Sequence, residues 1–389
     1  MTLRVLFVSH SLPPPHQPLA NLGGMQRLAM ETRAALAAHP DVQLSVRTLE
    51  SSWRWTGLRT APFLARLLWE IPRVVRRESI DVVLFSSMVT AALAPMLRPR
   101  LRGTGVALAV TPVGRDVTLP NSLHQRLVPS IFRALDLVLP ISRATGDECL
   151  ARGLTPERMR VLPCGVDLSR FETPDEDGSA RAELLSTLAK MGEAPIPDDA
   201  LLLCSVGRHQ ERKGFHWFVR DVMPHLPERV VYLLGGEGPM LPVIRRAVED
   251  RGLGERVRLL GRLPEETLLR LYRGADLFVM PNVPVSGDIE GFGIVMLEAG
   301  LSGTPVIAAD LEGIRDVVTP GENGELAPPL DAEGFARTIG RLLDDPDALA
   351  ALSRSASAHT AERFGWPGVA DRMVRLLRAA RPSARSEGA

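Results

Sequence analysis

The chain of 389 residues is too long for one ordinary domain and suits two, and its hydrophobic content of 45% is far above that of disordered chains. A formal net charge of zero argues against bulk nucleic-acid binding. The three cysteines, Cys149, Cys164 and Cys204, are scattered and odd in number, which fits neither a disulfide framework nor a metal site.

The first residues predict neither a signal peptide nor a membrane anchor. The apolar run from Val5 to Val8 is too short for a signal-peptide core. No stretch of the sequence reaches the ~18 apolar residues that a transmembrane helix needs. We therefore expect a cytoplasmic protein.

The first half of the chain alternates short apolar strands with helices. Residues 3–9 (LRVLFVS) have the continuous apolar character of a buried parallel strand. Gly23-Gly24 and a helix over about 25–38 follow. This is the phosphate-cradling layout of a Rossmann-like unit, although a tight turn also explains the glycines. Their spacing is not the dinucleotide fingerprint, so NAD is not expected. Further strands are expected at 43–48, 82–85, 106–110 and 137–140, with a short one at 160–162.

Residues 53–78 differ in character from their surroundings. They combine Trp53, Trp55 and Trp69 with several arginines and an apolar helical face. A basic amphipathic helix with tryptophans can lie in a membrane interface. More often such a helix packs its apolar face on its own sheet and leaves the arginines in solvent.

A second α/β series follows a segment with linker composition. Residues 172–199 are rich in Pro, Gly and acidic residues, contain one helix at 180–191, and predict an inter-domain linker. The later strands are expected at 201–206, 230–234, 257–260, 277–280 and 305–308, with helices starting near Gly214, Pro239, Pro264 and Gly293. We expect two Rossmann-like domains facing a cleft, at 1–171 and 200–366. Residues 331–381 are helical, and the final helix and tail, 367–389, are expected to pack back on the first domain.

The stretch 281–309 has two carboxylates in unusual settings. Glu290 lies in a loop of turn formers, and Glu298 lies on a helix that is apolar nearly all round. A carboxylate on such a helix faces a partner or a site, because an unpaired buried charge is costly. Glu298 is therefore either a structural salt bridge or cap, or part of a binding site. The run Gly291-Phe292-Gly293 places a helix N-terminus beside Glu290, which suits an anionic ligand.

Two cations follow the first strand of the second series. Arg208 comes directly after the strand and Gly207, and Lys213 begins the next helix. At the carboxyl end of a parallel sheet they can neutralise a diphosphate, although a solvated charged loop is the alternative. A glycine turn, Gly236-Glu237-Gly238-Pro239, follows the next strand. The sequence has no metal-ligand cluster, nucleophile elbow or P-loop.

Together these residues resemble the retaining GT-B glycosyltransferases of family 4, over almost the whole chain. The most specific part is Glu290-Gly-Phe-Gly-Ile-Val-Met-Leu-Glu298, which is similar to the E-x7-E motif of the family. Arg208 and Lys213 match its diphosphate-binding pair, and Gly236 to Pro239 its G-x-G-P turn. Residues 163–167 (PCGVD) resemble its P-N-G-V-D, with cysteine in place of asparagine.

The resemblance implies a donor, a reaction and a role for each residue. The donor would be a UDP- or GDP-sugar, transferred with retention to a sugar, glycolipid or small-molecule hydroxyl, without a cofactor or metal. Catalysis would rest on charge stabilisation of the departing diphosphate by Arg208 and Lys213. The sugar hydroxyls would bind Glu290 and the ribose hydroxyls Glu298. The remaining donor contacts would come from Gly23, Gly24, Gly207, Gly236, Arg262, Gly291, Phe292, Gly293 and Ile294.

One position departs from the family. The turn after the fourth strand often reads H-G-x-[DE], and its histidine contacts the donor sugar. Here Val113 precedes Gly114-Arg115-Asp116. His10, His16 or Asp116 are candidates to replace that contact. The departure leaves open a nucleotide-sugar-binding protein with weak or no turnover as an alternative to a transferase. A nucleotide-sugar epimerase on the same fold is a further alternative.

Overall fold

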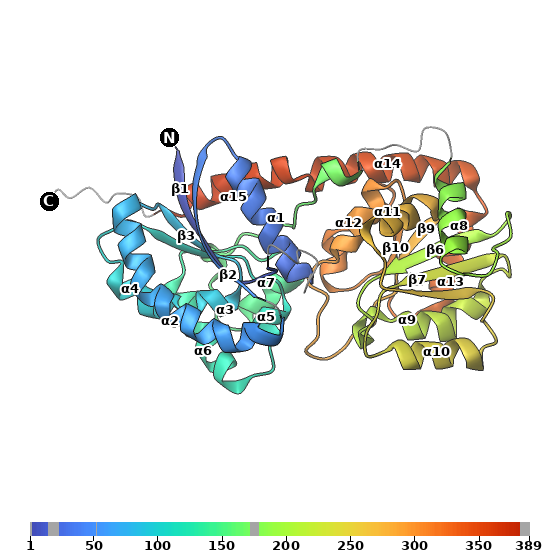
Figure 1. Ribbon diagram of the computed structural model, residues 1–389, viewed down its shortest axis with the longest axis horizontal. Helices are drawn as coiled ribbons and strands as arrows, with labels where there is room; N and C mark the ends of the chain where they lie inside the picture. The colour runs from blue at the N-terminus through green and yellow to red at the C-terminus, as the bar shows by residue number, and fades with distance from the viewer. Residues whose placement is uncertain (1, 15–22, 52, 172–178, 382–389) are drawn as a thin grey trace. The chain divides into compact units, whose positions relative to one another are not determined.

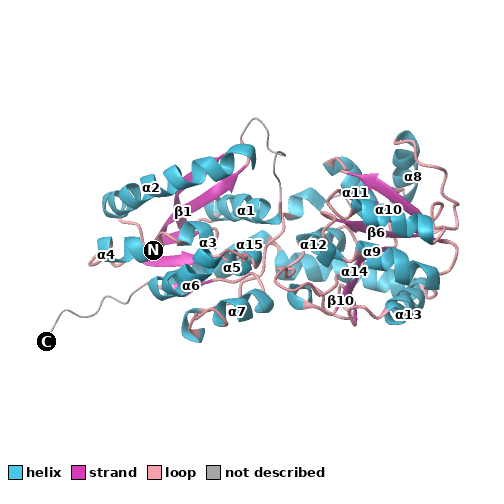
Figure 2. Ribbon diagram, turned by 90° about the horizontal axis from the view of Figure 1, so that it is seen from below, coloured by secondary structure: helices cyan, strands magenta, loops and turns pink. Residues whose placement is uncertain are grey.

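The computed structural model describes residues 2–14, 23–51, 53–171 and 179–381. They form two compact units. The first comprises the described residues up to Gly165 and from Trp366 onward, and the second comprises Val166–Gly365. Each unit is a parallel sheet with helices on both faces, drawn in magenta and cyan in Figure 2. Both the fold class and the two-sheet architecture expected from the sequence are confirmed.

The sheet of the first unit has the order β2-β1-β3-β4-β5, and every pair is parallel. Its strands are β1 (Leu3–Leu12), β2 (Val42–Glu50), β3 (Val82–Phe85), β4 (Ala107–Val110) and β5 (Leu137–Val138). Its helices are α1 (Gly24–Ala38), α2 (Trp53–Glu78), α3 (Met88–Ala91), α4 (Ala94–Arg100), α5 (Arg115–Thr118), α6 (Ser122–Ala134), α7 (Arg143–Leu150) and α15 (Trp366–Ala379), with a 3-10 turn at Pro156–Arg158.

The buried face of α2 completes the core of this unit. Apolar side chains of α2, α4 and α6 pack against β1, β3 and β4 in one cluster. On the opposite face of the sheet, α1 lies beside the C-terminal helix α15 (Figure 1). The indole N–H of Trp366 donates to Glu31 at 2.8 Å, and Arg378 pairs with Asp41 at 2.9 Å. The last helix therefore belongs to the first unit.

The sheet of the second unit has the order β11-β10-β9-β6-β7-β8 and is also parallel throughout. Its strands are β6 (Leu201–Val206), β7 (Val230–Gly235), β8 (Val257–Gly261), β9 (Leu277–Met280), β10 (Val306–Ala309) and β11 (Gly324–Ala327). Its helices are α8 (Ala180–Lys190), α9 (Phe215–Trp217), α10 (Leu241–Asp250), α11 (Glu265–Gly274), α12 (Ile294–Leu301), α13 (Ala332–Leu343) and α14 (Pro346–Phe364). Short 3-10 turns lie at Leu168–Phe171, Glu211–Lys213, Met223–His225 and Glu312–Asp316.

The strand order reverses between β6 and β9. From β6 the chain proceeds through β7 to β8 on one side, and then returns to β9 on the other. The loops that leave the carboxyl ends of β6 and β9 therefore diverge. Such a switch point is where open α/β sheets bind their ligands.

The predicted linker at 172–199 is corrected by the structure. Residues 172–178 lie outside the described residues, but α8 packs against α11 of the second unit. Leu184 of α8 lies so close to Gly274 that a side chain there would overlap it, and Arg181 pairs with Asp276 at 3.0 Å. The chain passes between the units at Gly165–Val166 and again at Gly365–Trp366.

Three local predictions also differ from the structure. Residues 160–162 are not a strand, and an isolated bridge pairs Met159, just before them, with Val138. The edge strand β11 (GELA) was not predicted, since it lacks β-branched and aromatic residues. The helix expected from Gly214 is short, and it continues as a π-helical turn at Phe218–Val222.

Candidate active site

The switch point of the second sheet brings together two residues that the sequence placed 77 positions apart. Lys213, in the loop after β6, and Glu290, in the loop after β9, form an ion pair with Nζ and Oε2 2.6 Å apart. The side-chain amide of Asn282 donates to the same carboxylate oxygen at 3.1 Å. Each charged side chain of the pair is only 9% exposed. The structure therefore joins the predicted diphosphate cation and the predicted sugar-binding carboxylate in one buried cluster.

Two further charged residues flank this pair. Arg212 lies 3.5 Å from Glu290 through Nε and 3.3 Å from Asp288 through Nη1. Burial disfavours ionisation of Glu290, but the positive charges of Lys213 and Arg212 outweigh it and hold the pKa of that carboxyl below its ordinary value. We expect an ionised Glu290 at neutral pH.

Two oxygen atoms of this cluster lack hydrogen-bond partners within the described part of the chain. They are Asn282 Oδ1 and Asp288 Oδ1, and both are buried. Arg212 Nε makes no hydrogen bond there either, although it lies 3.5 Å from the Glu290 carboxylate. Buried polar groups are normally satisfied, so acceptors without a donor at one place indicate a position for ligand or water. The sequence did not single out Asn282, Asp288 or Arg212, which lie in a loop of turn formers and in a charged loop, because their contacts depend on how the two loops meet.

Among the described residues of the second unit, Glu298 is the most enclosed carboxylate, with 1% of the residue exposed. It accepts hydrogen bonds from Arg170 Nη1 at 3.3 Å and from the Tyr272 hydroxyl at 3.1 Å. Arg170 also pairs with Glu265 at 2.7 Å. The structural salt bridge considered from the sequence is thus present, and the ribose-binding role stays a prediction.

The turn before α12 leaves the helix N-terminus open to a ligand. Gly293 is its N-cap residue at φ +88°, a left-handed conformation that favours glycine, and no side chain caps the first turn. Phe292 is buried against Phe364, with ring centroids 6.0 Å apart. Gly291, Gly293 and Ile294 remain partly exposed. Backbone N–H groups in this position suit a phosphate or a sugar oxygen.

The loops after β6 and β7 stack backbone against backbone. Gly236 has φ +120°, and a side chain there would overlap the carbonyl oxygen of Gly207. This packing holds the loop of Arg208 in place. Arg208 and Arg262 are both exposed, and Arg208 makes no ion pair with any described residue. The Arg208 guanidinium is therefore available to an anion.

In the first unit, the glycine pair starts α1 with both residues exposed. A side chain on Gly24 would meet no atom of the described residues within 4 Å. Packing within that part of the chain therefore leaves room for a close approach by a ligand.

The structure describes two of the three candidates to replace the missing histidine, Asp116 and His10. His16 lies outside the described residues. Both carboxylate oxygens of Asp116 accept backbone N–H groups, from Met88 at 2.9 Å and Val113 at 2.8 Å. Burial raises the pKa of Asp116, and these bonds oppose the rise. The contacts favour a role in positioning the turn over a catalytic role. His10 is 8% exposed, and its Nδ1 lies 3.3 Å from the Ser87 hydroxyl.

Because His10 is buried, we expect folding stability to depend on pH. Burial lowers the pKa of its imidazole from 6.5 to about 4. The stability that depends on neutral His10 is fully present above pH 6.5 and is lost as pH falls toward 4, because the unfolded chain then binds the extra proton. The loss amounts to at most about 3 kcal/mol. His10→Asn should flatten the decline of chemical-denaturation stability in this window, whereas replacing exposed His225 should not. Equal slopes for wild type and His10→Asn would contradict this.

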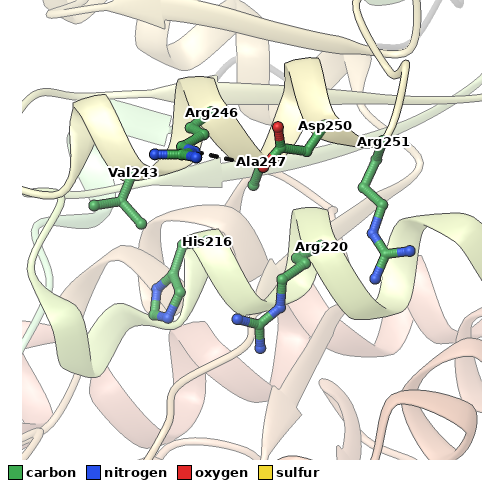
Figure 3. Close-up of a pocket in the computed structure, with 7 residues that line it drawn as sticks. All are labelled: His216, Arg220, Val243, Arg246, Ala247, Asp250 and Arg251. Carbon is green, nitrogen blue, oxygen red and sulfur yellow. Dashed lines mark ion pairs between the residues drawn. The ribbon is translucent and has the colours of Figure 1, made fainter.

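A surface groove of the second unit is lined by none of the predicted site residues (Figure 3). Its lining residues are His216, Arg220, Val243, Arg246, Ala247, Asp250 and Arg251. Its arginines are already matched by carboxylates: Arg246 lies 3.6 Å from Asp250, and Asp221 lies 2.6 Å from Arg220. Among the described residues, no group of three or more His, Cys, Asp or Glu side chains could hold a metal ion.

Two parallel α/β units, with a buried cation–carboxylate pair at one switch point, define a protein of the two-Rossmann, GT-B class. Residues 200–345 match the family model described as glycosyl transferases group 1, and residues 22–170 match that of glycosyltransferase family 4. The matches extend over both units. The chain belongs to this family of group 1, family 4 glycosyltransferases.

Individual relatives agree with this assignment. The chain is 33% identical over 263 residues to D-inositol 3-phosphate glycosyltransferase 1 of Catenulispora acidiphila, covering 64% of this chain and 59% of the relative. It spans only about half the length of other relatives that act on D-inositol 3-phosphate. It is 29% identical over 314 residues to the GDP-mannose-dependent alpha-(1-6)-phosphatidylinositol monomannoside mannosyltransferase of Mycolicibacterium smegmatis, covering 78% of each.

A solved structure shows the same fold. Anabaena HepE, crystallised in complex with UDP, superposes with a TM-score of 0.74 over 97% of this chain and 100% of its own. The two sequences are 18% identical.

Proposed function

We propose that the protein transfers a sugar from a UDP- or GDP-sugar to an acceptor hydroxyl and retains the anomeric configuration. The observation that carries this proposal is the buried Lys213–Glu290 pair at the switch point, beside buried oxygens of Asn282 and Asp288 that accept no hydrogen bond from any described residue. A nucleotide sugar presents a diphosphate and hydroxyls side by side. These are the partners that an ammonium and a carboxylate bind best.

The pair suggests how the donor is bound and activated. On donor binding, Lys213 moves its ammonium from Glu290 to the diphosphate, and Arg208 adds a second positive charge. Glu290 then accepts hydrogen bonds from sugar hydroxyls. As the glycosidic bond breaks, negative charge develops on the leaving diphosphate, and cations fixed in a water-poor site stabilise it. Two side-chain cations take the place of a metal ion in this scheme.

The acceptor is proposed to be a glycolipid, a sugar or another small molecule. Relatives named for inositol phosphate and phosphatidylinositol mannoside substrates support this range. A panel of UDP-, GDP- and ADP-sugars, with nucleotide release followed with and without EDTA, tests the activity. Release that persists in EDTA is expected, whereas strict dependence on added divalent metal would contradict the metal-free mechanism. Tight donor binding without turnover on any acceptor extract would instead identify a binding protein. Interconversion of free nucleotide sugars without acceptor would identify an epimerase.

Glu298 is proposed to bind the ribose hydroxyls. Glu298→Ala should raise the dissociation constant of UDP or GDP about 10- to 100-fold, because charged hydrogen bonds are lost. Arg170 keeps Glu265 as a partner, so the variant should remain folded. Calorimetry compares it with Glu290→Ala, which should weaken nucleotide binding less. The reverse order would overturn the division of roles.

We further propose peripheral contact with the inner face of a membrane through α2. No helix in the described parts of the chain is long and apolar enough to cross a membrane. One face of α2 is buried in the core, as in the packing alternative considered from the sequence. Its other face exposes Leu58 (71%) and Trp69 (67%) beside arginines. Residues 51–135 have 12 arginines and four acidic residues, although the whole chain is neutral. Such a surface suits anionic lipid.

Replacing Trp69 tests this contact. Trp69→Ala should reduce cosedimentation with vesicles containing an anionic phospholipid by about five- to tenfold, because the indole no longer inserts at the interface. Leu330 of the second unit, which is 53% exposed, is the matched control for loss of an exposed apolar side chain. Equal binding by wild type and Trp69→Ala, or binding that is insensitive to salt, would contradict the proposal.

A further inference from the structure

The loop after β10 is hydrogen-bonded to the backbone of the loop that contains Glu290. The backbone N–H of Glu290 donates to the carboxylate of Glu312. In return, the N–H of Gly313 donates to the carbonyl oxygen of Glu290 at 3.2 Å. The two segments approach so closely that a side chain on Gly313 would overlap the Gly291 carbonyl. The position of Glu290 thus depends on Glu312, which the sequence analysis did not identify.

Glu312 occupies a backbone conformation that glutamate rarely adopts. Its φ is +47°, in the left-handed region where glycine is favoured. Glutamate is therefore unfavourable for this backbone conformation, but its carboxylate accepts the hydrogen bond from the Glu290 N–H. Unfavourable conformations held in place by their surroundings cluster at functional sites.

Carboxylates outnumber cations in this cluster. Among the described residues, Asp288, Glu290 and Glu312 face two cations. Burial and the charge of Glu290 raise the pKa of the Glu312 carboxyl, as expected where negative charge is already in excess. Arg212 is shared between Asp288 and Glu290, and Lys213 pairs with Glu290. When Lys213 turns to a diphosphate, the excess of negative charge grows further. Asp288 Oδ1 is already buried without a hydrogen-bond partner among the described residues. The cluster can therefore accept hydrogen bonds from hydroxyls, whereas another carboxylate would meet like charge in a poorly hydrated place.

We propose that the acidic cluster Asp288–Glu290–Glu312 selects donors whose sugar has no carboxylate, so that neutral hexoses are used and hexuronic acids are rejected. Glu312 acts as a positioning residue: it orients Glu290 through the backbone and adds negative charge beside the sugar. This inference rests on the proposed donor-binding function of the site.

Paired donors that differ only in the sugar carboxylate test the inference. The pairs are UDP-glucose with UDP-glucuronate and GDP-mannose with GDP-mannuronate. For each, kcat/KM of nucleotide release and affinity by competition are measured. In the wild type, the ratio of kcat/KM for the neutral donor to kcat/KM for the acidic donor should be on the order of tenfold or more. Glu312→Gln keeps an oxygen for the Glu290 N–H and removes the charge, so it should lower this ratio several-fold. Asp288→Asn should narrow it as well.

Glu312→Ala separates charge from positioning. It removes both the charge and the acceptor, so turnover of the neutral donor should fall well below that of Glu312→Gln, and thermal melting confirms that each variant is folded. Equal use of both donor classes by wild type, or an unchanged ratio in both Glu312→Gln and Asp288→Asn, would overturn the inference while leaving the proposed function intact. A wild-type protein that neither binds nor turns over any donor would instead contradict the proposed function itself.

Discussion

Replacing Lys213 with methionine should lower kcat/KM for the preferred donor by about 10²- to 10³-fold. Methionine keeps most of the side-chain volume but cannot neutralise the charge that develops on the leaving diphosphate. Lys213 and Lys190 are the only lysines of the chain, and Lys190 is exposed at the end of α8. Lys190→Met is therefore the matched control, and it should retain wild-type kinetics. Near-normal activity of Lys213→Met would remove this cation from the mechanism.

The same substitution should have a measurable effect on folding. Without Lys213, Arg212 at 3.5 Å is the remaining cationic neighbour of the buried Glu290 among the described residues. Breaking a buried ion pair on one side costs about 3–5 kcal/mol, with Arg212 reducing that cost here. The double variant Lys213→Met, Glu290→Gln should recover stability in denaturant melts, because neither partner is left charged. It should not recover activity. Additive losses of stability in the double variant would show that the two residues are uncoupled.

Glu290→Gln should reduce kcat by about 10²-fold with a smaller change in KM. The amide preserves the shape of the side chain and loses the charge that hydrogen-bonds the sugar hydroxyls most strongly. Interactions made mainly in the transition state change kcat and kcat/KM together. Steady-state kinetics with saturating acceptor, or nucleotide release by hydrolysis, measures this. A large rise in KM with unchanged kcat would assign Glu290 to uniform donor binding.

Sequence patterns predicted the two α/β series because parallel strands buried on both faces are short, apolar and continuous. β6 and β9 were placed almost to the residue. The sequence could not show that these two strands are neighbours, since strand order depends on how helices pack over the sheet. Lys213 and Glu290 were therefore found as separate features, and their contact came only from the structure.

Other parts of the site depend on contacts that leave no local pattern. Arg170 is 128 residues from its partner Glu298, and nothing in residues 168–171 predicts the pairing. Glu312 gave no signal either, because a glutamate at φ +47° breaks the propensity rules from which turns are predicted. The helix α8 was assigned to a linker from composition alone, whereas its side chains pack on α11. The contacts of Glu298 and Glu312, which local sequence patterns could not predict, both belong to the candidate site.

Hydrogen–deuterium exchange on addition of UDP- and GDP-sugars locates the donor site on the chain. We expect the preferred donor to slow exchange at residues 207–214, 235–239 and 288–298. The same donor should give little protection in Lys213→Met. Absence of protection in these segments at saturating donor, or protection confined to the groove around Arg220 and Arg246, would contradict the assignment of the donor site to the switch point between β6 and β9.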